Sequence, residues 1–344
     1  MRALAKLAKA EASVGMIDAP KPSAGPGEVL IRVAAAGICG TDMAIYNWTP
    51  RMRPRVAPPR ILGHEATGRI EELGAGVSGL AVGDRVSLES HIFCGQCRYC
   101  RRGDAHLCAS LAYPGISIDG GFADWVTVPA QIARPVPDRL DDRTAAMIEP
   151  FGIAVHACMA QRGVAGKTVL INGCGPIGLM TVAAARALGA RRILAADPNP
   201  LRLKLAGQMG ADATVDPANA DVVAAAKALG DGFGVDVAIE YSGVAAGLDA
   251  VLASADRMAD IRLVAGPNAP HALDVNALLR TGVSIYGIHG RRLWQDWDLA
   301  VELLADKRVD IAMLADPILP LDRAVEGFEA IVAGRALKPI LLTA

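Results

Sequence analysis

The chain has 344 residues, of which 52% are hydrophobic and 21% are charged, and this composition excludes an intrinsically disordered protein. Lys and Arg together number 35 against 36 Asp and Glu, so net charge gives no reason to expect a nucleic acid or an anionic membrane as partner. With domains of roughly 100–200 residues, the length predicts two or three of them.

Neither a membrane anchor nor a secretion signal is indicated. No segment supplies the ~18 uninterrupted apolar residues that a membrane helix requires. Near the N-terminus, Lys6, Lys9 and Glu11 stand where a signal peptide would need an apolar stretch. We therefore expect a soluble, cytoplasmic protein without a membrane partner.

Short runs in the first 150 residues alternate between apolar and polar side chains, as half-buried strands do. They cover residues 28–36, 67–73, 80–90 and 122–129. Glycines and prolines separate them at short intervals, which predicts a small β-rich domain.

After Pro150 the pattern changes, and strand-like runs alternate with Ala-rich helical stretches. Predicted strands cover residues 168–172, 192–196, 235–239, 261–265 and 283–288, and predicted helices cover 177–188 and 200–209. This alternation indicates βαβ units and a parallel sheet, and hence an α/β fold. From about Trp294 the chain returns to helix and short strands, which could pack against the first domain.

Gly173, Gly175 and Gly178 form a GxGxxG motif between a predicted strand and a predicted helix. In a dinucleotide-binding turn, such glycines permit the tight turn, the approach of a pyrophosphate and close helix–sheet packing. Asp197, about 20 residues further on, is placed to bind the adenosine ribose hydroxyls, which favours NAD over NADP. Arg202 complicates that preference, although it could equally pack over the adenine. The alternative is an ordinary glycine-rich turn.

Four cysteines lie within one short segment. They are Cys94, Cys97, Cys100 and Cys108. Four thiolates satisfy tetrahedral zinc without leaving an open position, so we expect a structural zinc ion. A redox-active cluster and a nucleic-acid-binding zinc ribbon are the alternatives. The segment contains arginines but lacks the paired CxxC knuckles of a ribbon.

Cys39, His64 and Glu65 lie beside glycines in the first domain, and Glu149 lies at its end. Taken singly, each has an ordinary structural interpretation. Together, a thiol and an imidazole make two good zinc ligands, with Glu65 as a third ligand or a nearby partner. A catalytic zinc ion keeps one position open for water or substrate, unlike a four-sulfur site.

The chain resembles the zinc-dependent medium-chain dehydrogenases along essentially its whole length. The segments that carry the resemblance are GICGTD (37–42), GHE (63–65), GDRVSLES (83–90), the four-cysteine segment, EPFGIAVH (149–156) and GCGPIG (173–178). Within the family, residues 41–48, 88–97 and 287–297 are most similar to the threonine dehydrogenases. Sorbitol and butanediol dehydrogenases share the zinc motifs and are the nearest alternatives.

The resemblance implies a GroES-like β-barrel catalytic domain over residues 1–150 and 291–344, with a zinc lobe at about 90–110. It implies a Rossmann domain, a doubly wound parallel sheet, over residues 151–290. It further implies two zinc ions per chain, NAD as cofactor, a small alcohol as substrate, and a homodimer or homotetramer in which the 283–288 strand could pair.

The resemblance also assigns roles to single residues. Cys39, His64 and Glu65 match the catalytic zinc positions, and Glu149 matches an acidic position near that zinc ion's fourth site. Thr41 matches the hydroxyl residue that accepts the proton of the substrate alcohol. The four cysteines match the structural zinc ligands. Matched nucleotide-contacting positions are Ile177, Asp197, Arg202, Val264 to Gly266, Ile288 and His289.

Two features bear on the substrate. Ala44 occupies the position of a family histidine that receives the relayed proton, which weakens the threonine assignment, whereas His91 resembles the substrate-side segment of threonine dehydrogenases. The 50–60 loop carries Arg51, Arg53, Arg55 and Arg60. It could clamp a carboxylate or phosphate, although a solvated basic loop is the preferred interpretation. A non-catalytic nucleotide-binding module that holds only the structural metal is the alternative from another class.

Overall fold

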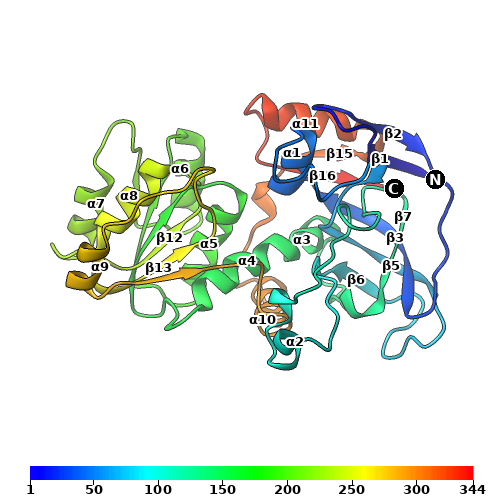
Figure 1. Ribbon diagram of the computed structural model, residues 1–344, viewed down its shortest axis with the longest axis horizontal. Helices are drawn as coiled ribbons and strands as arrows, with labels where there is room; N and C mark the ends of the chain where they lie inside the picture. The colour runs from blue at the N-terminus through cyan, green and yellow to red at the C-terminus, as the bar shows by residue number, and fades with distance from the viewer. Residues whose placement is uncertain (344) are drawn as a thin grey trace. The chain divides into compact units, whose positions relative to one another are not determined.

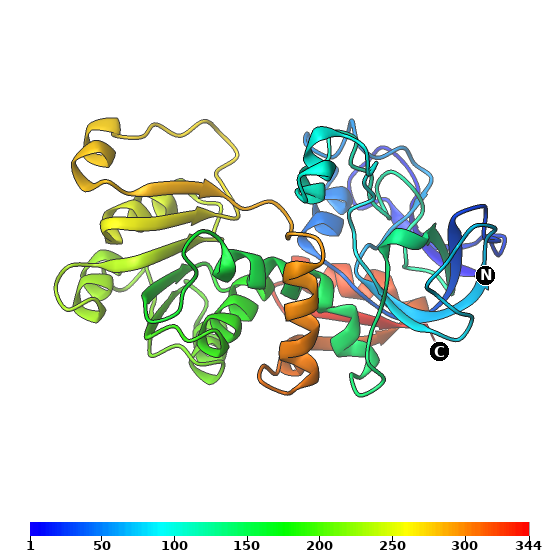
Figure 2. The same cartoon turned by 90° about the horizontal axis from the view of Figure 1, so that it is seen from below.

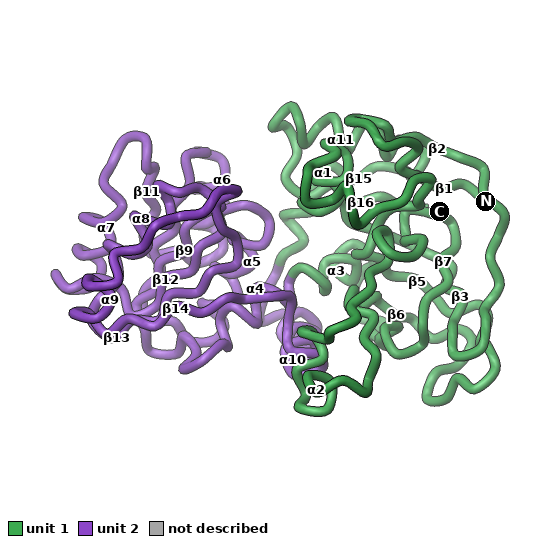
Figure 3. Tube along the Cα trace, viewed as in Figure 1, with its two compact units in different colours: residues 1–150, 311–344 green, residues 151–310 purple. Residues whose placement is uncertain are grey.

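The computed structural model describes residues 1–343 and divides the chain into two compact units. Unit 1 comprises residues 1–150 and the segment from Ile311 to the end of the described chain, and unit 2 comprises Phe151–Asp310 (Figure 3). The chain therefore leaves unit 1, builds unit 2, and returns to complete unit 1 (Figure 1). Over the described residues, no helix is long and apolar enough to cross a membrane.

Unit 1 is built on a seven-stranded sheet, in the order β15-β16-β3-β5-β6-β8 with β7 paired to β3. Its strands are β3 (Glu28–Gly37), β5 (Ala66–Leu73), β6 (Arg85–Leu88), β7 (Trp125–Pro129), β8 (Ala133–Pro135), β15 (Ala315–Pro320) and β16 (Lys338–Leu342). A three-stranded sheet, β2-β1-β4, consists of β1 (Arg2–Lys6), β2 (Val14–Asp18) and β4 (Arg60–Ile61). Its helices are α1 (Gly40–Tyr46), α2 (Arg98–Arg101), α3 (Asp142–Ala146) and α11 (Ala324–Val332), with 3-10 turns at Ala105–Leu107, Ala130–Ile132, Ala312–Leu314 and Leu321–Arg323.

The return of the chain matters for the site. Strand β16 pairs antiparallel with β3, and Ile340 lies opposite Gly37. The Ile38 amide also donates a hydrogen bond to the Pro339 carbonyl at 3.0 Å. The C-terminal strand is therefore joined directly to the segment that leads into Cys39.

Unit 2 is a six-stranded sheet in the order β11-β10-β9-β12-β13-β14, and all of its strand pairs are parallel. Numbered within the unit, this is the 3-2-1-4-5-6 order of doubly wound dinucleotide-binding sheets. The strands are β9 (Thr168–Asn172), β10 (Arg192–Ala196), β11 (Ala213–Val215), β12 (Val235–Glu240), β13 (Ala255–Leu263) and β14 (Ser284–Gly287). The helices are α4 (Ile148–Met159), which begins in unit 1, α5 (Pro176–Ala187), α6 (Pro200–Gln208), α7 (Val222–Leu229), α8 (Ala245–Ser254), α9 (Val275–Thr281) and α10 (Gln295–Ala305). Figures 1 and 2 show this sheet lying between its helices, and the predicted α/β fold is confirmed.

Strand β13 differs from the prediction because it begins six residues before the apolar run at 261–265. Its register against β12 shifts at Val235/Val237, and Met258 adopts a positive φ of 62°. Two charged residues within it, Asp260 and Arg262, are fully buried. The Arg262 guanidinium donates to the carbonyl oxygens of Ala157, Cys158 and Gly163, so its burial is compensated by hydrogen bonds that the hydropathy pattern does not show.

The return to unit 1 also lies further along the chain than the expected residue 291. Residues 291–310 belong to unit 2 because α10 packs there: Trp297 is 1% exposed, and Asp296 Oδ2 lies 2.9 Å from His156 Nδ1 on α4. A helix placed next to a boundary can pack against either domain, and the sequence pattern does not distinguish the two outcomes.

Candidate active site

Cys39 occupies the N-cap of α1, directly after β3 and Ile38. Its Sγ accepts a hydrogen bond from the Asp42 amide at 3.5 Å, and the Asp42 carboxylate accepts one from the Cys39 amide at 3.0 Å. This reciprocal capping box fixes the thiol at the start of the helix. Thr41 lies in the first turn of the same helix, and Ala44 lies three residues after it.

His64 and Glu65 precede β5 in a turn that requires glycine at position 63. Gly63 has a φ of +95°, and a Cβ there would lie 2.4 Å from the ring of Phe122. The turn places His64 Nε2 3.4 Å from Cys39 Sγ. The ligand atoms of Cys39, His64 and Glu65 all lie within 4.8 Å of one another.

The donor set of these three residues fits zinc. Thiolate, imidazole and carboxylate are its usual protein ligands, and three of them leave a position for substrate. The buried Nδ1 of His64 has no hydrogen-bond partner among the described residues, so it is not tied to another protein group. Withdrawal of the Cys39 thiol from water raises its pKa well above the usual value, and the carboxylates of Asp42 and Glu65 add to that rise. A thiolate at this position therefore needs a cation as partner.

Glu65 also has a protein partner that the sequence analysis did not identify. Its carboxylate pairs with the ammonium of Lys338 at the start of β16, and both side chains are 2% exposed. The same ammonium donates to the Ile38 carbonyl at 3.1 Å. Burial raises the pKa of Glu65 to about 7, against the opposing effect of Lys338. The one available signal was a lysine within the apolar C-terminal run.

Further polar residues surround this group. The hydroxyl of Ser90 donates to Glu149 Oε1 at 2.6 Å, and the charge of Glu149 contributes to the raised pKa of Glu65. His91 Nδ1 lies 2.5 Å from Glu89 Oε1, and all three side chains at 89–91 are buried. The sequence analysis named Glu149 and His91 but missed Glu89. Only the folded chain shows that Glu89 is buried and pairs with His91.

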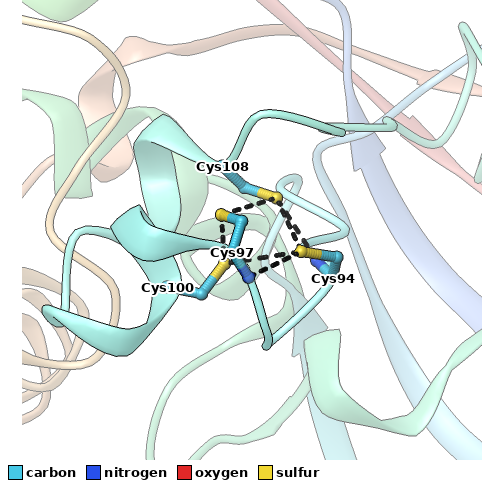
Figure 4. Close-up of side chains that lie close together, drawn as sticks. All are labelled: Cys94, Cys97, Cys100 and Cys108. Carbon is cyan, nitrogen blue, oxygen red and sulfur yellow. Dashed lines mark hydrogen bonds between the residues drawn. The ribbon is translucent and has the colours of Figure 1, made fainter.

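The second cysteine group lies in a lobe formed by α2 and the 3-10 turn at Ala105–Leu107 (Figure 4). All four thiols are free, and neighbouring sulfurs are separated by 3.5 Å (Cys94–Cys108 and Cys97–Cys100), 3.9 Å (Cys97–Cys108) and 4.0 Å (Cys94–Cys100). A disulfide requires ~2 Å, whereas a tetrahedron with metal–sulfur bonds of ~2.3 Å has edges of ~3.8 Å. The spacing therefore fits an ion at the centre of the four sulfurs.

Backbone amides point at these sulfurs. The amides of Cys94 and Ser110 donate to Cys108 Sγ at 3.3 and 3.4 Å, and the Cys97 amide donates to Cys94 Sγ at 3.4 Å. Backbone hydrogen bonds, led by that of Cys100, lower the pKa of Cys97 to about 6. These amides thus favour the thiolate, the form that binds zinc, at Cys97, whereas burial and the neighbouring thiols raise the pKa of Cys100 to about 12, so that thiol needs the ion itself to ionise.

In unit 2, the GxGxxG turn connects β9 to α5. Gly173 has a φ of +97°, and a Cβ there would lie 2.7 Å from the Ser242 amide nitrogen. A Cβ on Gly178 would lie 1.9 Å from the Gly173 carbonyl oxygen, whereas one on Gly175 would meet nothing within 4 Å. The first and third glycines are therefore required by the turn itself, and the second borders open space at the N-terminus of α5, where a pyrophosphate can bind.

A cavity of about 590 Å³ adjoins this turn. Gly173, Gly175, Asp197 and Arg202 line it, together with residues from the start of α7 and from α8. Asp197 is 4% exposed and accepts hydrogen bonds from the Cys174 and Asn199 amides, both at 2.8 Å. Arg202 Nη1 lies 3.6 Å from Asp197 Oδ2. The carboxylate is thus fixed at the edge of a cavity of cofactor size.

The other predicted nucleotide contacts do not line this cavity. Ile177 lies in the first turn of α5, Val264 and Gly266 follow β13, and Ile288 and His289 follow β14. The Ile288 amide donates to the Leu263 carbonyl at 2.9 Å, which holds the ends of β13 and β14 together. These residues share the carboxyl edge of the parallel sheet with the glycine turn, and their contact with cofactor remains a prediction.

A thiol–imidazole–carboxylate group on one unit and a dinucleotide turn on the other define the class of protein: a metal-dependent oxidoreductase that uses a nicotinamide cofactor. Residues 25–138 match the alcohol dehydrogenase GroES-like domain family, and residues 176–306 match the zinc-binding dehydrogenase family. An L-threonine 3-dehydrogenase of Shewanella sp. (strain MR-7) is 38% identical over 341 residues, 99% of each chain.

Solved structures agree with these matches. Alcohol dehydrogenase TADH from Thermus sp. ATN1 superposes with a TM-score of 0.92 at 29% identity, over 99% of both chains. The 2R,3R-butanediol dehydrogenase from Bacillus subtilis superposes with a TM-score of 0.90 at 27% identity, over 100% of this chain and 99% of that one. The chain belongs to the zinc-dependent medium-chain dehydrogenases and is an NAD-dependent alcohol dehydrogenase.

Proposed function

We propose that this enzyme oxidises the secondary alcohol of L-threonine or a close 2-amino-3-hydroxy acid, with NAD as hydride acceptor. The observation that carries the proposal is the Cys39–His64–Glu65 group in a chain that is 38% identical, over 99% of its length, to an L-threonine 3-dehydrogenase. Cys39, His64 and Glu65 would hold a catalytic zinc ion, and the four-cysteine lobe would hold a structural one, giving two per chain.

Zinc, when bound, would supply a Lewis acid for the substrate oxygen, and NAD would supply the hydride acceptor. The chain's own residues provide positioning and proton transfer. Thr41, on α1 two residues after Cys39, is the hydroxyl assigned to receive the alcohol proton. Ala44, one turn later, cannot accept it, so water or another group must complete the transfer. Glu149, held by Ser90, is the carboxylate assigned to the vicinity of the metal.

The cofactor would occupy the cavity at the glycine turn, with its adenosine ribose at Asp197. Val264 to Gly266, Ile288 and His289 would contact its nicotinamide half. The assembly would be a dimer or tetramer. This is supported by β14, which pairs only with β13 among the described strands and therefore leaves an open sheet edge on which a second copy could pair. A cytoplasmic location is supported by the seven free cysteines, which suit a reducing compartment.

A second candidate is oxidation of a polyol or vicinal diol. It is favoured by the likeness to 2R,3R-butanediol dehydrogenase and by Ala44, which stands in place of the histidine that threonine dehydrogenases keep. A rate comparison on L-threonine, sorbitol and 2,3-butanediol with NAD separates the two candidates. We expect the highest kcat/KM for L-threonine. A higher kcat/KM for either of the other substrates would replace threonine by a polyol or diol, and turnover of none of the three would contradict both candidates.

A further inference from the structure

The short turn after Trp48 holds its arginines in fixed places. The Met52 amide donates to the Thr49 carbonyl at 2.9 Å, and the Val56 amide donates to the Met52 carbonyl at 3.2 Å. The side chains of Met52 and Val56 are buried in the core of unit 1, at 0% and 3% exposure. Arg53 and Arg55 lie between these two anchors and are exposed. The backbone that carries them is therefore fixed by packing rather than being a loose basic loop.

The arginines of this loop differ in what engages them. Arg60 pairs with Asp119 at 2.9 Å, and Arg53 Nε donates to the Trp48 carbonyl at 3.0 Å. Arg55 Cζ stands 5.4 Å from the centroid of the Tyr113 ring. Over residues 1–343, no hydrogen bond or ion pair engages the Arg55 guanidinium. A cation–π contact uses the face of the ring and none of the five N–H donors of the guanidinium, so these donors stay available for two-point binding of an oxyanion.

Tyr113 connects Arg55 to two segments that carry or adjoin the candidate site residues. Its ring meets the ring of His91 edge-on, with centroids 5.3 Å apart. The segment that follows Tyr113 lies directly on the residue before His64: a Cβ on Gly115 would lie 2.7 Å from the Gly63 nitrogen, and the Gly121 amide donates to the Gly63 carbonyl at 2.8 Å. These contacts all lie within unit 1.

The charges around Arg55 match a zwitterionic substrate. Tyr113 contacts both Arg55 and His91, His91 pairs with Glu89, and Ser90 joins this segment to Glu149. An amino acid presents one ammonium and one carboxylate to its enzyme, and a buried acidic segment connected through Tyr113 to an unpaired arginine offers a partner for each.

We propose that Arg55 is a specificity-determining residue that binds the oxyanion of the substrate, which under the proposed function is the carboxylate of the amino acid. The inference rests on that function for the identity of the anion. Its geometric basis is the unpaired guanidinium over Tyr113, whose ring contacts His91 and whose following segment packs on Gly63. A phosphate group offers the same oxygen chemistry and is separated from a carboxylate by the experiment.

The experiment compares wild type, Arg55→Gln and Arg51→Gln as zinc-loaded, full-length enzymes. Arg51 is the matched control, because it is an exposed arginine of the same turn without an aromatic partner among the described residues. We expect Arg55→Gln to lower kcat/KM for L-threonine by roughly 10- to 100-fold, mainly through KM, and to leave kcat/KM for uncharged 2,3-butanediol unchanged. Arg51→Gln should leave both values close to wild type.

A competitive-inhibition experiment tests anion binding by Arg55 without requiring that threonine be the substrate. L-valine, which carries the same charged groups as threonine without the hydroxyl, and inorganic phosphate are tested as inhibitors of 2,3-butanediol oxidation. A rise of about tenfold or more in the inhibition constant of either anion, in Arg55→Gln alone, supports the proposal and identifies the anion, even if threonine is not turned over. Equal constants in all three proteins, no inhibition of wild type by either anion, or an equal loss of kcat/KM on both alcohols would overturn it.

Discussion

Lys338 and Glu65 form a buried ion pair at the candidate zinc group. Both side chains are 2% exposed, and the ammonium also holds the Ile38 carbonyl, one residue before Cys39. The pair therefore fastens the C-terminal strand to the metal-binding segment. Removing one partner of such a pair leaves an uncompensated charge in a poorly solvated place, which costs far more than losing a surface pair.

In the metal-free protein, we expect Lys338→Met to lower the free energy of unfolding by about 3–5 kcal/mol, measured by urea denaturation. In the same metal-free state, the double variant Lys338→Met/Glu65→Gln should recover part of that loss, because no charge is then left unpaired. Lys21→Met, which breaks the exposed pair with Glu71, is the control and should cost no more than about 1 kcal/mol. Similar losses in Lys338→Met and Lys21→Met would show that the buried pair is not structural.

Asp197 combines two tasks, since its carboxylate both caps the glycine turn and borders the cofactor cavity. Its negative charge should repel a 2′-phosphate. We expect Asp197→Asn, which removes the charge but keeps an acceptor oxygen, to raise the NADP-to-NAD ratio of kcat/KM by at least about tenfold. Steady-state kinetics with both cofactors measures the ratio. An unchanged ratio would mean that the ribose is recognised elsewhere.

Among the elements, the cysteine lobe depends most on an ion. Its helix α2 has four residues, none of them buried, so apolar packing contributes little there. The four sulfurs, at 3.5–4.0 Å from their neighbours, bring the beginning of the lobe at Cys94 against its end at Cys108. A structural zinc ion at such a position contributes folding energy directly.

We expect Cys97→Ser to lose one zinc ion per chain and to lower the Tm by several degrees, because the lobe loses its cross-link. Elemental analysis counts the metal, and calorimetry measures the Tm. Cys158→Ser is the control: this buried thiol belongs to unit 2 and to neither cysteine group, and its loss should leave the metal content unchanged. An unchanged zinc content in Cys97→Ser would exclude the lobe as a metal site.

At the scale of the whole molecule, the two units carry separable halves of the reaction. The candidate catalytic group lies entirely in unit 1, and the residues that line the cofactor cavity lie entirely in unit 2. A substitution in the candidate catalytic group should therefore leave cofactor binding intact. The non-catalytic alternative makes a different prediction, because its wild-type protein would hold only the structural metal ion, one per chain.

We expect the wild-type protein to contain two zinc ions per chain and Cys39→Ser to retain one, with turnover abolished and NAD affinity within about twofold of wild type. Elemental analysis and fluorescence titration of NAD give the two values. Full activity in Cys39→Ser would remove this thiol from the mechanism, and one zinc ion in the wild type would favour the non-catalytic module.

Much of the fold and of the candidate sites could be predicted from the sequence, because the motifs that indicate them lie within short stretches of the chain. Strand β9 and helix α5 surround a six-residue glycine motif, and four cysteines lie within fifteen positions, so chain connectivity alone brings each group together. The strands at 2–6 and 14–18 escaped prediction, because their pairing with each other and with β4 is set by contacts that no periodic pattern records.

The sequence by itself determined the βαβ alternation with its parallel sheet and the close spacing of the four cysteines, since periodicity and spacing are properties of neighbouring residues. The doubly wound arrangement followed from the family resemblance, and the candidate ligands named from the sequence stay a prediction. Only the tertiary structure decided that Lys338 pairs with Glu65 across 273 positions, that α10 belongs to unit 2, and that the Arg55 guanidinium lies over the Tyr113 ring. Each of these depends on which distant surfaces meet. Such contacts are settled by burial and charge compensation over the whole fold, not by any short stretch of chain.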